Sequence, residues 1–310
     1  MMTPDRFTLQ ELYLDVGNEH QLYIQEWGNK TSARTIIFLH GGPGAGCSDR
    51  HKQLFDGDKE HVIFFDQRGA GKSLPKGCLE HNTTAELIED IKKIAHHFRL
   101  KTFILTGGSW GSCLALAYAI KYPKSVSAMV LRGIYTGSRV ETDYLDKGGF
   151  QLFYPDVWEA YLQRTPKQHH NDPSAFHYAQ MMSGDAEKVK ASSYAYGELE
   201  TSLLQLDDRH TPQDFETFDP DAMKIELHYL GNRCFMPDKY ILNNAHIISA
   251  PVWLVQGRYD MVCPPKTAYE LSKRLPNSKL IFTQAGHSGR DRAAYEVTKA
   301  LLLEIAAWKQ

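Results

Sequence analysis

One serine lies in a pattern that could supply a catalytic nucleophile. Residues 107–111 read Gly-Gly-Ser-Trp-Gly, a G-x-S-x-G motif with Ser109 at its centre. The apolar run 103–106 before it is typical of a buried strand, and the Ala- and Leu-rich stretch 112–122 after it is typical of a buried helix. A serine on a sharp strand-to-helix turn is held above a sheet, where its hydroxyl can attack a carbonyl carbon. Glycine suits both flanks of this turn, because a Cβ there would collide with a neighbouring strand or helix.

A serine hydroxyl becomes a good nucleophile when a base removes its proton, and a neutral imidazole does this best near pH 7. In an open parallel sheet, groups that meet such a serine lie in loops after the C-terminal ends of strands. His287 follows the predicted strand 280–283, and Asp260 follows the predicted strand 252–256. The chain order Ser109, Asp260, His287 is the order expected on this architecture. We expect Asp260 to orient the imidazole and stabilise its protonated form.

Two backbone N–H groups are candidates for holding the oxyanion that forms during such a reaction. The N–H of Trp110 would lie at a helix N-terminus, where negative charge is stabilised. Residues 40–44 read His-Gly-Gly-Pro-Gly, a glycine-rich loop that can offer a second donor. Pro43 has no N–H, so we favour Gly42 as this donor.

Two other patterns do not support alternative chemistry. Residues 69–73 look like the end of a phosphate-binding loop, but Asp66 stands where that motif requires its first glycine. No H-E-x-x-H or other dense ligand spacing supports a metal site. We therefore expect neither a metal nor a cofactor.

The elements that must position these residues follow a strand–helix rhythm. Short apolar strands are predicted in two blocks that flank a long helical stretch: 35–39, 62–65, 103–106 and 128–131, then 252–256 and 280–283. An N-terminal hairpin is predicted from 8–16 and 21–27, and helices from 155–163, 186–206, 219–230, 266–275 and 291–308. This predicts an α/β fold, a mostly parallel sheet covered by helices. We expect a core from residues 1–139 and 246–310 and an inserted helical cap at 140–245.

Charge, hydropathy and cysteine content limit the partners and the compartment that we expect for this protein. The 310 residues carry a formal net charge of −2, which gives no electrostatic footprint for nucleic acid or an anionic membrane. No stretch approaches about 20 apolar residues, so no membrane span is expected. Five scattered cysteines indicate free thiols in a reducing compartment, and we expect a cytoplasmic protein. The oligomeric state stays open.

Taken together, these segments resemble the proline iminopeptidase (prolyl aminopeptidase) family, serine peptidases of the α/β-hydrolase fold. The similarity extends over nearly the whole chain, and its most specific part is Gly-Gly-Ser-Trp-Gly-Ser at 107–112. It also covers the segments 40–44, 66–69, 131–134, 256–260, 262–264 and 285–288. The resemblance implies an inserted helical cap and the release of an N-terminal proline.

The resemblance also implies a set of substrate-binding residues. Glu198 and Glu226 are similar to two cap glutamates that bind the substrate's amino terminus in this family. Arg132 falls where the family places an arginine near this site, and Cys263 where it places a pocket cysteine. A free N-terminus is cationic near neutrality, so carboxylates above the nucleophile would select such substrates through charge-assisted hydrogen bonds.

The departures from the family lie in the cap. The two tryptophans of the family's Trp-x-x-Trp-Glu pattern correspond here to Tyr194 and Gly197, ahead of Glu198. Aromatic positions that line the family's proline pocket are Tyr135 and Leu230 in this chain. A strict preference for proline is therefore not implied.

We expect an aminopeptidase acting on short peptides or amino-acid amides with a free N-terminus, through an acyl-enzyme. One alternative is an esterase, lactonase or amidase with the same three catalytic residues, in which alanine at Glu198 or Glu226 would barely change activity. A second alternative is a non-catalytic receptor of the same fold. Such a receptor would be labelled stoichiometrically at Ser109 but would show negligible turnover of esters and peptides.

Overall fold

The sheet has eight strands and is mostly parallel, as predicted. The computed structural model describes residues 5–206 and 218–308. The strands are β1 (Thr8–Gly17), β2 (His20–Gly28), β3 (Thr35–Leu39), β4 (His61–Phe65), β5 (Phe103–Ser109), β6 (Val126–Ile134), β7 (Val252–Gly257) and β8 (Ser278–Thr283). Their order across the sheet is β1-β2-β4-β3-β5-β6-β7-β8. The β1–β2 and β2–β4 pairs are antiparallel, and all other neighbours are parallel.

The N-terminal hairpin forms where the sequence predicted it. Gly17 pairs with His20, so only two residues make the turn between β1 and β2. Both of these residues, Asn18 and Glu19, have positive φ angles, of 53° and 64°. Two left-handed residues in succession give a turn whose twist matches that of the strands it joins, which favours tight pairing.

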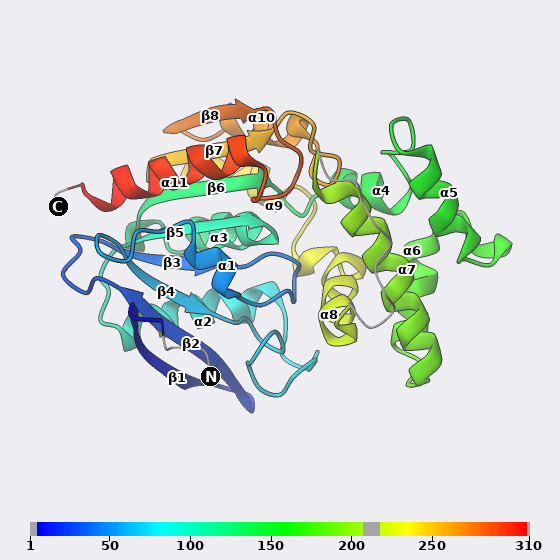
Figure 1. The fold of residues 1–310 in the computed structure, drawn as a ribbon, viewed down its shortest axis with the longest axis horizontal. Helices are drawn as coiled ribbons and strands as arrows, with labels where there is room; N and C mark the ends of the chain where they lie inside the picture. The colour runs from blue at the N-terminus through cyan, green and yellow to red at the C-terminus, as the bar shows by residue number, and fades with distance from the viewer. Residues whose placement is uncertain (1–4, 207–217, 309–310) are drawn as a thin grey trace.

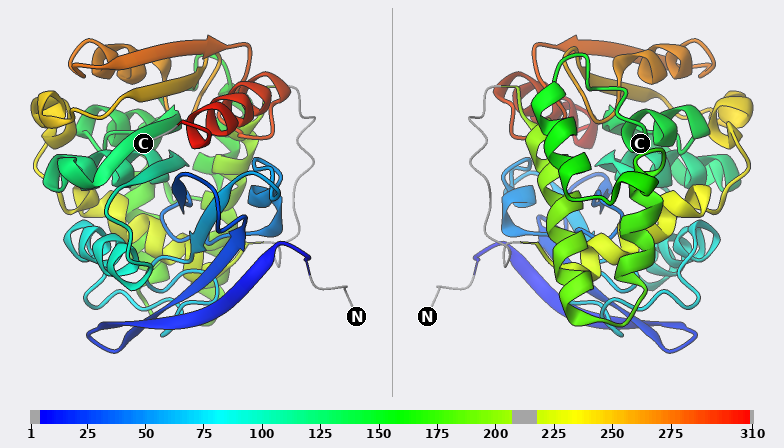
Figure 2. Two further views of the ribbon diagram at one scale, coloured as in Figure 1. Left: turned by 90° about the vertical axis from the view of Figure 1, so that its left-hand side faces the viewer. Right: turned by 90° about the vertical axis from the view of Figure 1, so that its right-hand side faces the viewer.

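Helices cover both faces of the sheet, which explains why its central strands are apolar throughout. Successive side chains of a strand point to opposite faces, so Ile37 and Leu39 of β3 pack with one layer while Ile36 and Phe38 pack with the other. The first layer contains α2 (Thr84–His97), α3 (Trp110–Lys121) and α10 (Pro265–Ser272). The opposite layer contains α1 (Asp49–Lys52) and α11 (Arg292–Ala306), as Figure 2 shows.

All described elements between β6 and β7 are helical. They are α4 (Arg139–Asp146), α5 (Pro155–Gln163), α6 (Pro173–Met181), α7 (Ala186–Leu204), α8 (Pro220–Gly231) and α9 (Tyr240–Asn244), with short 3₁₀ turns. Helices α4 to α8 stand beyond the end of the sheet toward which its parallel strands run (Figure 1). The sequence pattern predicts α5, α7 and α8 but does not reveal α4, α6 and α9, which have nine residues or fewer.

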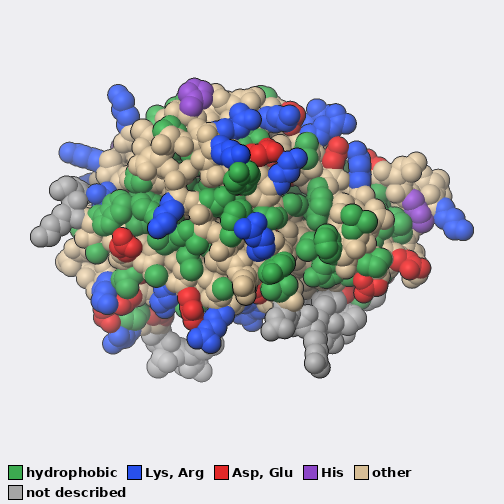
Figure 3. Space-filling view, turned by 90° about the horizontal axis from the view of Figure 1, so that it is seen from above, with side chains coloured by type: hydrophobic (Ala, Val, Ile, Leu, Met, Phe, Trp, Pro, Cys, Tyr) green, Lys and Arg blue, Asp and Glu red, His purple; other side chains and the backbone are tan. Residues whose placement is uncertain are grey.

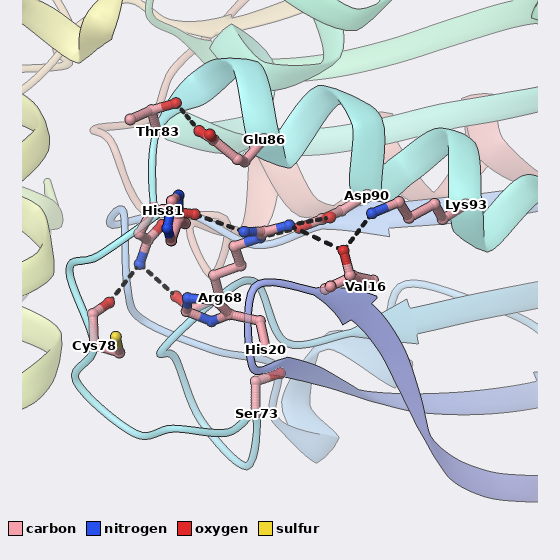
Figure 4. Close-up of polar contacts among 12 residues, drawn as sticks. Val16, His20, Arg68, Ser73, Cys78, His81, Thr83, Glu86, Asp90 and Lys93 are labelled. Carbon is pink, nitrogen blue, oxygen red and sulfur yellow. Dashed lines mark hydrogen bonds and ion pairs between the residues drawn. The ribbon is translucent and has the colours of Figure 1, made fainter.

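A buried ion pair fastens the loop after β4 to α2 (Figure 4). The Arg68 guanidinium donates from Nε and Nη2 to the two oxygens of Asp90, at 2.6 and 2.8 Å, and from Nη1 to the His81 carbonyl at 2.6 Å. Both side chains of the pair are at most 1% exposed. Asn82 donates to the Arg68 carbonyl and accepts from the Tyr229 hydroxyl at 2.9 Å, which ties α8 to the same loop.

Replacing Asp90 by alanine is expected to lower the free energy of unfolding by about 3–5 kcal/mol, because it leaves the buried Arg68 cation unpaired. Urea unfolding of the variant measures this. The matched control is Glu296→Ala, which removes the exposed pair with Arg292 on α11 and should cost at most about 0.5 kcal/mol. Equal losses in the two variants would contradict the prediction.

The surface and the cysteines add little information about the function of the protein. Within residues 5–206 and 218–308, no helix combines the length and the apolar character that a membrane span needs. On the face seen in Figure 3, charged side chains of both signs are scattered among apolar ones. All five cysteines are free thiols, as predicted.

Candidate active site

Ser109 lies at the sharp turn that the sequence motif predicts. It is the last residue of β5 and caps α3, with φ 56° and ψ −127°, a backbone shape that side-chain-bearing residues rarely adopt. A Cβ added at Gly107 or Gly111 would lie 2.6 or 2.2 Å from the Leu39 carbonyl oxygen of β3. Both glycines are therefore required, because β3 passes directly beneath the turn.

A second serine of the motif holds this turn in place. The Ser112 hydroxyl donates to the Ser109 carbonyl at 2.7 Å and accepts from the Tyr135 N–H at 3.1 Å. It thereby joins the start of α3 to the end of β6. The serine at the sixth position of the motif therefore has a structural role at this turn.

The structure brings His287 and Asp260 together. The His287 Nδ1 lies 3.0 and 2.9 Å from the two Asp260 carboxylate oxygens, and both residues are buried. The same carboxylate accepts from the N–H groups of Val262 and Cys263, at 3.0 and 2.7 Å, and from Gln256 Nε2 at 3.1 Å. With so many donors Asp260 is a fixed acceptor, so Nδ1 of His287 carries the hydrogen and Nε2 keeps its lone pair.

Arg132 supports the histidine loop from behind. Its Nη1 donates to the His287 carbonyl at 2.8 Å. The imidazole lies against β6 at Gly133, where an added Cβ would stand 3.1 Å from Cε1 of His287. Arg132 does not line the cavity described below. Its position fits support of the histidine loop and not direct contact with a substrate.

The two predicted oxyanion donors are connected by a side-chain network. Trp110 is the first residue of α3, so its N–H has no acceptor within the helix, and Gly42 lines the cavity at Ser109. His40 accepts the Gln67 N–H at Nε2 (2.9 Å) and donates from Nδ1 to the Gly41 carbonyl (2.9 Å). Gln67 donates to the His40 carbonyl and accepts from the Trp110 indole N–H at 2.8 Å. Burial lowers the pKa of His40, which keeps this bridging imidazole neutral.

Ser109 opens into a cavity that is lined by both acidic and apolar side chains. Besides Ser109, Gly42 and Thr142, the lining residues are the acids Glu141, Asp146, Glu200 and Glu226 and the residues Tyr135, Leu145, Leu230, Val262 and Cys263. The structure thus brings the predicted Tyr135, Leu230, Cys263 and Glu226 to Ser109. The Cys263 thiol lines the cavity with Ser109, and burial raises the pKa of this thiol well above its usual range.

Glu198 does not reach this cavity, which corrects the expectation drawn from the resemblance. It faces a separate hollow with Tyr161, while Glu200 lines the cavity. The cause is helical geometry, since two residues along α7 turn the side-chain direction by about 200°. A match shifted by two residues places Tyr196 and Leu199 at the tryptophans of the Trp-x-x-Trp-Glu pattern and Glu200 at its glutamate. That shifted match is the signal that identifies Glu200.

Glu200 and Glu226 form a carboxyl pair across the cavity, one from α7 and one from α8. Both side chains are buried in the cavity next to one another. Burial and the adjacent Glu200 carboxyl raise the pKa of Glu226 well above its ordinary value, and burial raises the pKa of Glu200. Two adjacent buried carboxylates repel one another, which favours one proton on the pair.

Known proteins resemble this chain in sequence and in fold. A family described as the alpha/beta hydrolase fold matches residues 34–290. A probable proline iminopeptidase of Leptolyngbya boryana is 39% identical over 89% of this chain and 87% of its own length. The proline iminopeptidase of Neisseria gonorrhoeae is 36% identical over 90% of each chain. Among solved structures, an esterase from Exiguobacterium antarcticum superposes with a TM-score of 0.67 over 96% of this chain and 99% of its own, at 16% identity.

The fold and the matches place the protein among the α/β-hydrolases. The relatives at 36–39% identity extend over nine-tenths of the chain, through both the sheet and the helices between β6 and β7. Within that class, the chain belongs to the proline iminopeptidase family. The resemblance seen in the sequence motifs is confirmed.

Proposed function

We propose that this protein is a serine aminopeptidase that releases the N-terminal residue, most readily proline, from short peptides. The observation that carries the proposal is the placement of Ser109 in one cavity with the Glu200–Glu226 pair. Carboxyl groups there match the cationic amino terminus of a peptide whose first carbonyl lies at the serine. The names of the relatives support the same activity.

In the proposed reaction, Ser109 Oγ attacks the carbonyl carbon of the first residue while Nε2 of His287 takes the hydroxyl proton. Asp260 holds the imidazole and stabilises its cationic form. The N–H groups of Gly42 and Trp110 stabilise the oxyanion, and each such donor typically contributes roughly 3–4 kcal/mol. His287 then protonates the leaving amine as the C–N bond breaks. Water, deprotonated by the same imidazole, hydrolyses the acyl-enzyme and restores the Ser109 hydroxyl.

The cavity fits an N-terminal proline in this reaction. The ring would pack against the apolar lining residues, which include Tyr135, Leu145 and Leu230. The secondary ammonium of proline carries two N–H donors, and Glu200 and Glu226 supply one acceptor group for each. An acylated N-terminus lacks the charge and both donors, so it would leave the buried carboxyl groups uncompensated.

We also propose that residues 140–245 act as a cap that selects the substrate. The residues assigned to the chemical step lie in loops at the ends of strands, whereas Glu200 and Glu226 come from α7 and α8 between β6 and β7. Substrate recognition and bond cleavage then belong to different parts of the chain. The free thiols favour a reducing compartment, which fits the cytoplasm.

Binding of the cationic amino terminus should release about one proton from the Glu200–Glu226 pair, because the ammonium replaces the shared proton. Because the pKa values of both carboxyl groups are raised, we expect the free enzyme to hold this proton, and KM to rise as the pH falls and displacement of the proton becomes harder. The acids Glu141 and Asp146 and the imidazole of His287 also face this region. Calorimetry of prolinamide binding in two buffers of different ionisation enthalpy measures the proton released.

The control for this pH prediction is Glu226→Gln, which cannot hold a dissociable proton at that position. Proton release should disappear in this variant, and its KM should depend less on pH below neutrality. Binding of prolinamide to wild-type enzyme without proton release would contradict a shared proton in the free pair.

The test of the proposed function compares kcat/KM for a prolyl arylamide, its N-acetyl derivative and a simple aryl ester. We expect rapid cleavage of the free prolyl substrate and a loss of at least about 100-fold on acetylation, from two lost charge-assisted hydrogen bonds. Equal cleavage of the acetylated substrate would favour an esterase or amidase. Labelling of Ser109 without turnover of any substrate would favour a receptor.

A further inference from the structure

Four carboxyl groups line the cavity, and one of them is engaged by its own loop. Glu141 accepts from the N–H groups of Thr136 and Ser138, at 3.1 and 3.0 Å, and from the Ser138 hydroxyl at 2.7 Å. Together with Ser138 it forms the capping box that begins α4. This acid holds the backbone in place, and its acceptors are already occupied.

Two further carboxyl groups, those of Glu200 and Glu226, lie next to each other in the cavity. Glu200 and Glu226 line the cavity together and supply two acceptors when an ammonium enters. In the binding mode proposed above, these two acceptors match the two N–H donors of an N-terminal proline. A proline substrate therefore leaves no donor on its amino group for another acid.

Asp146 is the fourth acid that lines the cavity. Its Oδ1 is buried and has no hydrogen-bond partner among the described residues. Asp146 is also the last residue of α4, where the helix dipole disfavours a negative charge. Burial raises the pKa of Asp146 to about 6. The fold thus keeps a carboxylate in the substrate cavity at a position that does not stabilise it.

The number of N–H donors distinguishes proline from every other N-terminal residue. The secondary ammonium of proline has two, whereas the primary ammonium of the other amino acids has three. We propose that Asp146 accepts the third N–H of a primary ammonium, and so extends this aminopeptidase from proline to acyclic N-terminal residues such as alanine. The inference rests on the proposed function, because it concerns the same cavity and the same bound group.

The rest of the cavity wall fits this extension. Leu145 and Leu230 present aliphatic side chains, which can pack against an acyclic side chain as well as against a ring. Leu145 precedes Asp146 on α4, so one helix end supplies both an apolar contact and the additional acceptor. A small acyclic side chain could pack against these apolar residues while its ammonium spans three carboxyl groups.

The experiment uses three arylamides on wild-type enzyme, Asp146→Asn and Asp146→Ala. The substrates are prolyl, alanyl and N-methylalanyl arylamides, and in the last of these a methyl group replaces one N–H donor of the alanyl ammonium. We expect both variants to lose about tenfold or more in kcat/KM for the alanyl substrate, since a hydrogen bond to a charged group is lost. The prolyl and N-methylalanyl substrates should change by less than about twofold.

A matched control separates this effect from a general loss of negative charge. Asp143 lies on the same helix and forms exposed ion pairs with Arg139 and Lys147, so Asp143→Asn should leave the alanyl-to-prolyl ratio unchanged. Thermal unfolding supplies a second measurement. Asp146→Asn should be at least as stable as wild type above pH 6, because it removes a buried charge from a helix C-terminus.

The outcomes distinguish a failure of the Asp146 proposal from a failure of the proposed function. If wild-type enzyme cleaves the prolyl substrate but not the alanyl one, or if both variants lose activity equally on all three substrates, the role of Asp146 is overturned. If wild-type enzyme cleaves none of them, the proposed function itself fails. A selective loss on the alanyl substrate, with folding intact, supports the third acceptor.

Discussion

Replacing Ser109 by alanine is expected to lower kcat for prolyl arylamide hydrolysis by about 10⁴- to 10⁶-fold. The loss is this large because the acyl-enzyme can no longer form, and only oxyanion stabilisation and substrate positioning remain. Single-turnover assays at high enzyme concentration measure the residual rate. Binding of prolinamide should persist, since the carboxyl pair that holds its ammonium comes from α7 and α8.

A second comparison shows whether Ser109 acts together with His287. The variant His287→Ala should lose nearly as much activity as Ser109→Ala, and the double variant should lose little more than either one. Residues that work as one unit show this lack of additivity. Losses that multiply in the double variant would mean that His287 acts on another step. The contacts among Asp260, His287 and Arg132 would then need a different interpretation.

The second large effect is expected at Glu200, and the chain supplies its own control two residues away. Glu200→Gln should lower kcat/KM for the prolyl substrate by about 100-fold, because a charge-assisted hydrogen bond to the ammonium, worth about 1.5–3 kcal/mol, is lost from a buried site. Glu198→Gln should change it by less than about threefold. Both substitutions lie on α7, remove one negative charge and preserve side-chain size.

The reverse ranking would restore the residue first inferred from the resemblance. A large loss in Glu198→Gln with little change in Glu200→Gln would mean that the substrate's amino terminus binds at the hollow beside Tyr161. Circular dichroism on both variants checks that α7 is intact. A control with an uncharged aryl ester adds a further test, since its hydrolysis should respond weakly to either substitution.

Much of the fold could be predicted because its strands carry a strong local signal. The strand Thr35–Leu39 has the predicted bounds, since a central strand of a covered sheet is apolar on both faces. Helix α4 gives no comparable signal. It has eight residues, and its start is set by the capping contacts of Glu141, which depend on the loop that precedes it.

The residues of the candidate site also differ in how well the sequence predicts their positions. Ser109, Asp260 and His287 follow strands, and their positions come from the regular geometry of strand ends. Glu200 lies on a helix whose outward direction changes with every residue, so an error of two positions in a weak match selects the wrong face. The free oxygen of Asp146 depends on three helices meeting around the cavity. Nothing in the local sequence around α4 predicts it.

The bridge from His40 through Gln67 to Trp110 has a consequence for how this enzyme could diversify. It joins both oxyanion donors through residues of the loops after β3 and β4 and the first residue of α3, and the hydrogen bonds of the bridge involve none of the helices between β6 and β7. The Tyr229 ring of α8 packs on the Trp110 ring at 4.8 Å, so substitutions in those helices should leave the bridge intact as long as this contact is kept. A laboratory exchange of residues 140–245 between relatives should transfer substrate preference as a module, with the intrinsic rate of acyl transfer inherited from the recipient.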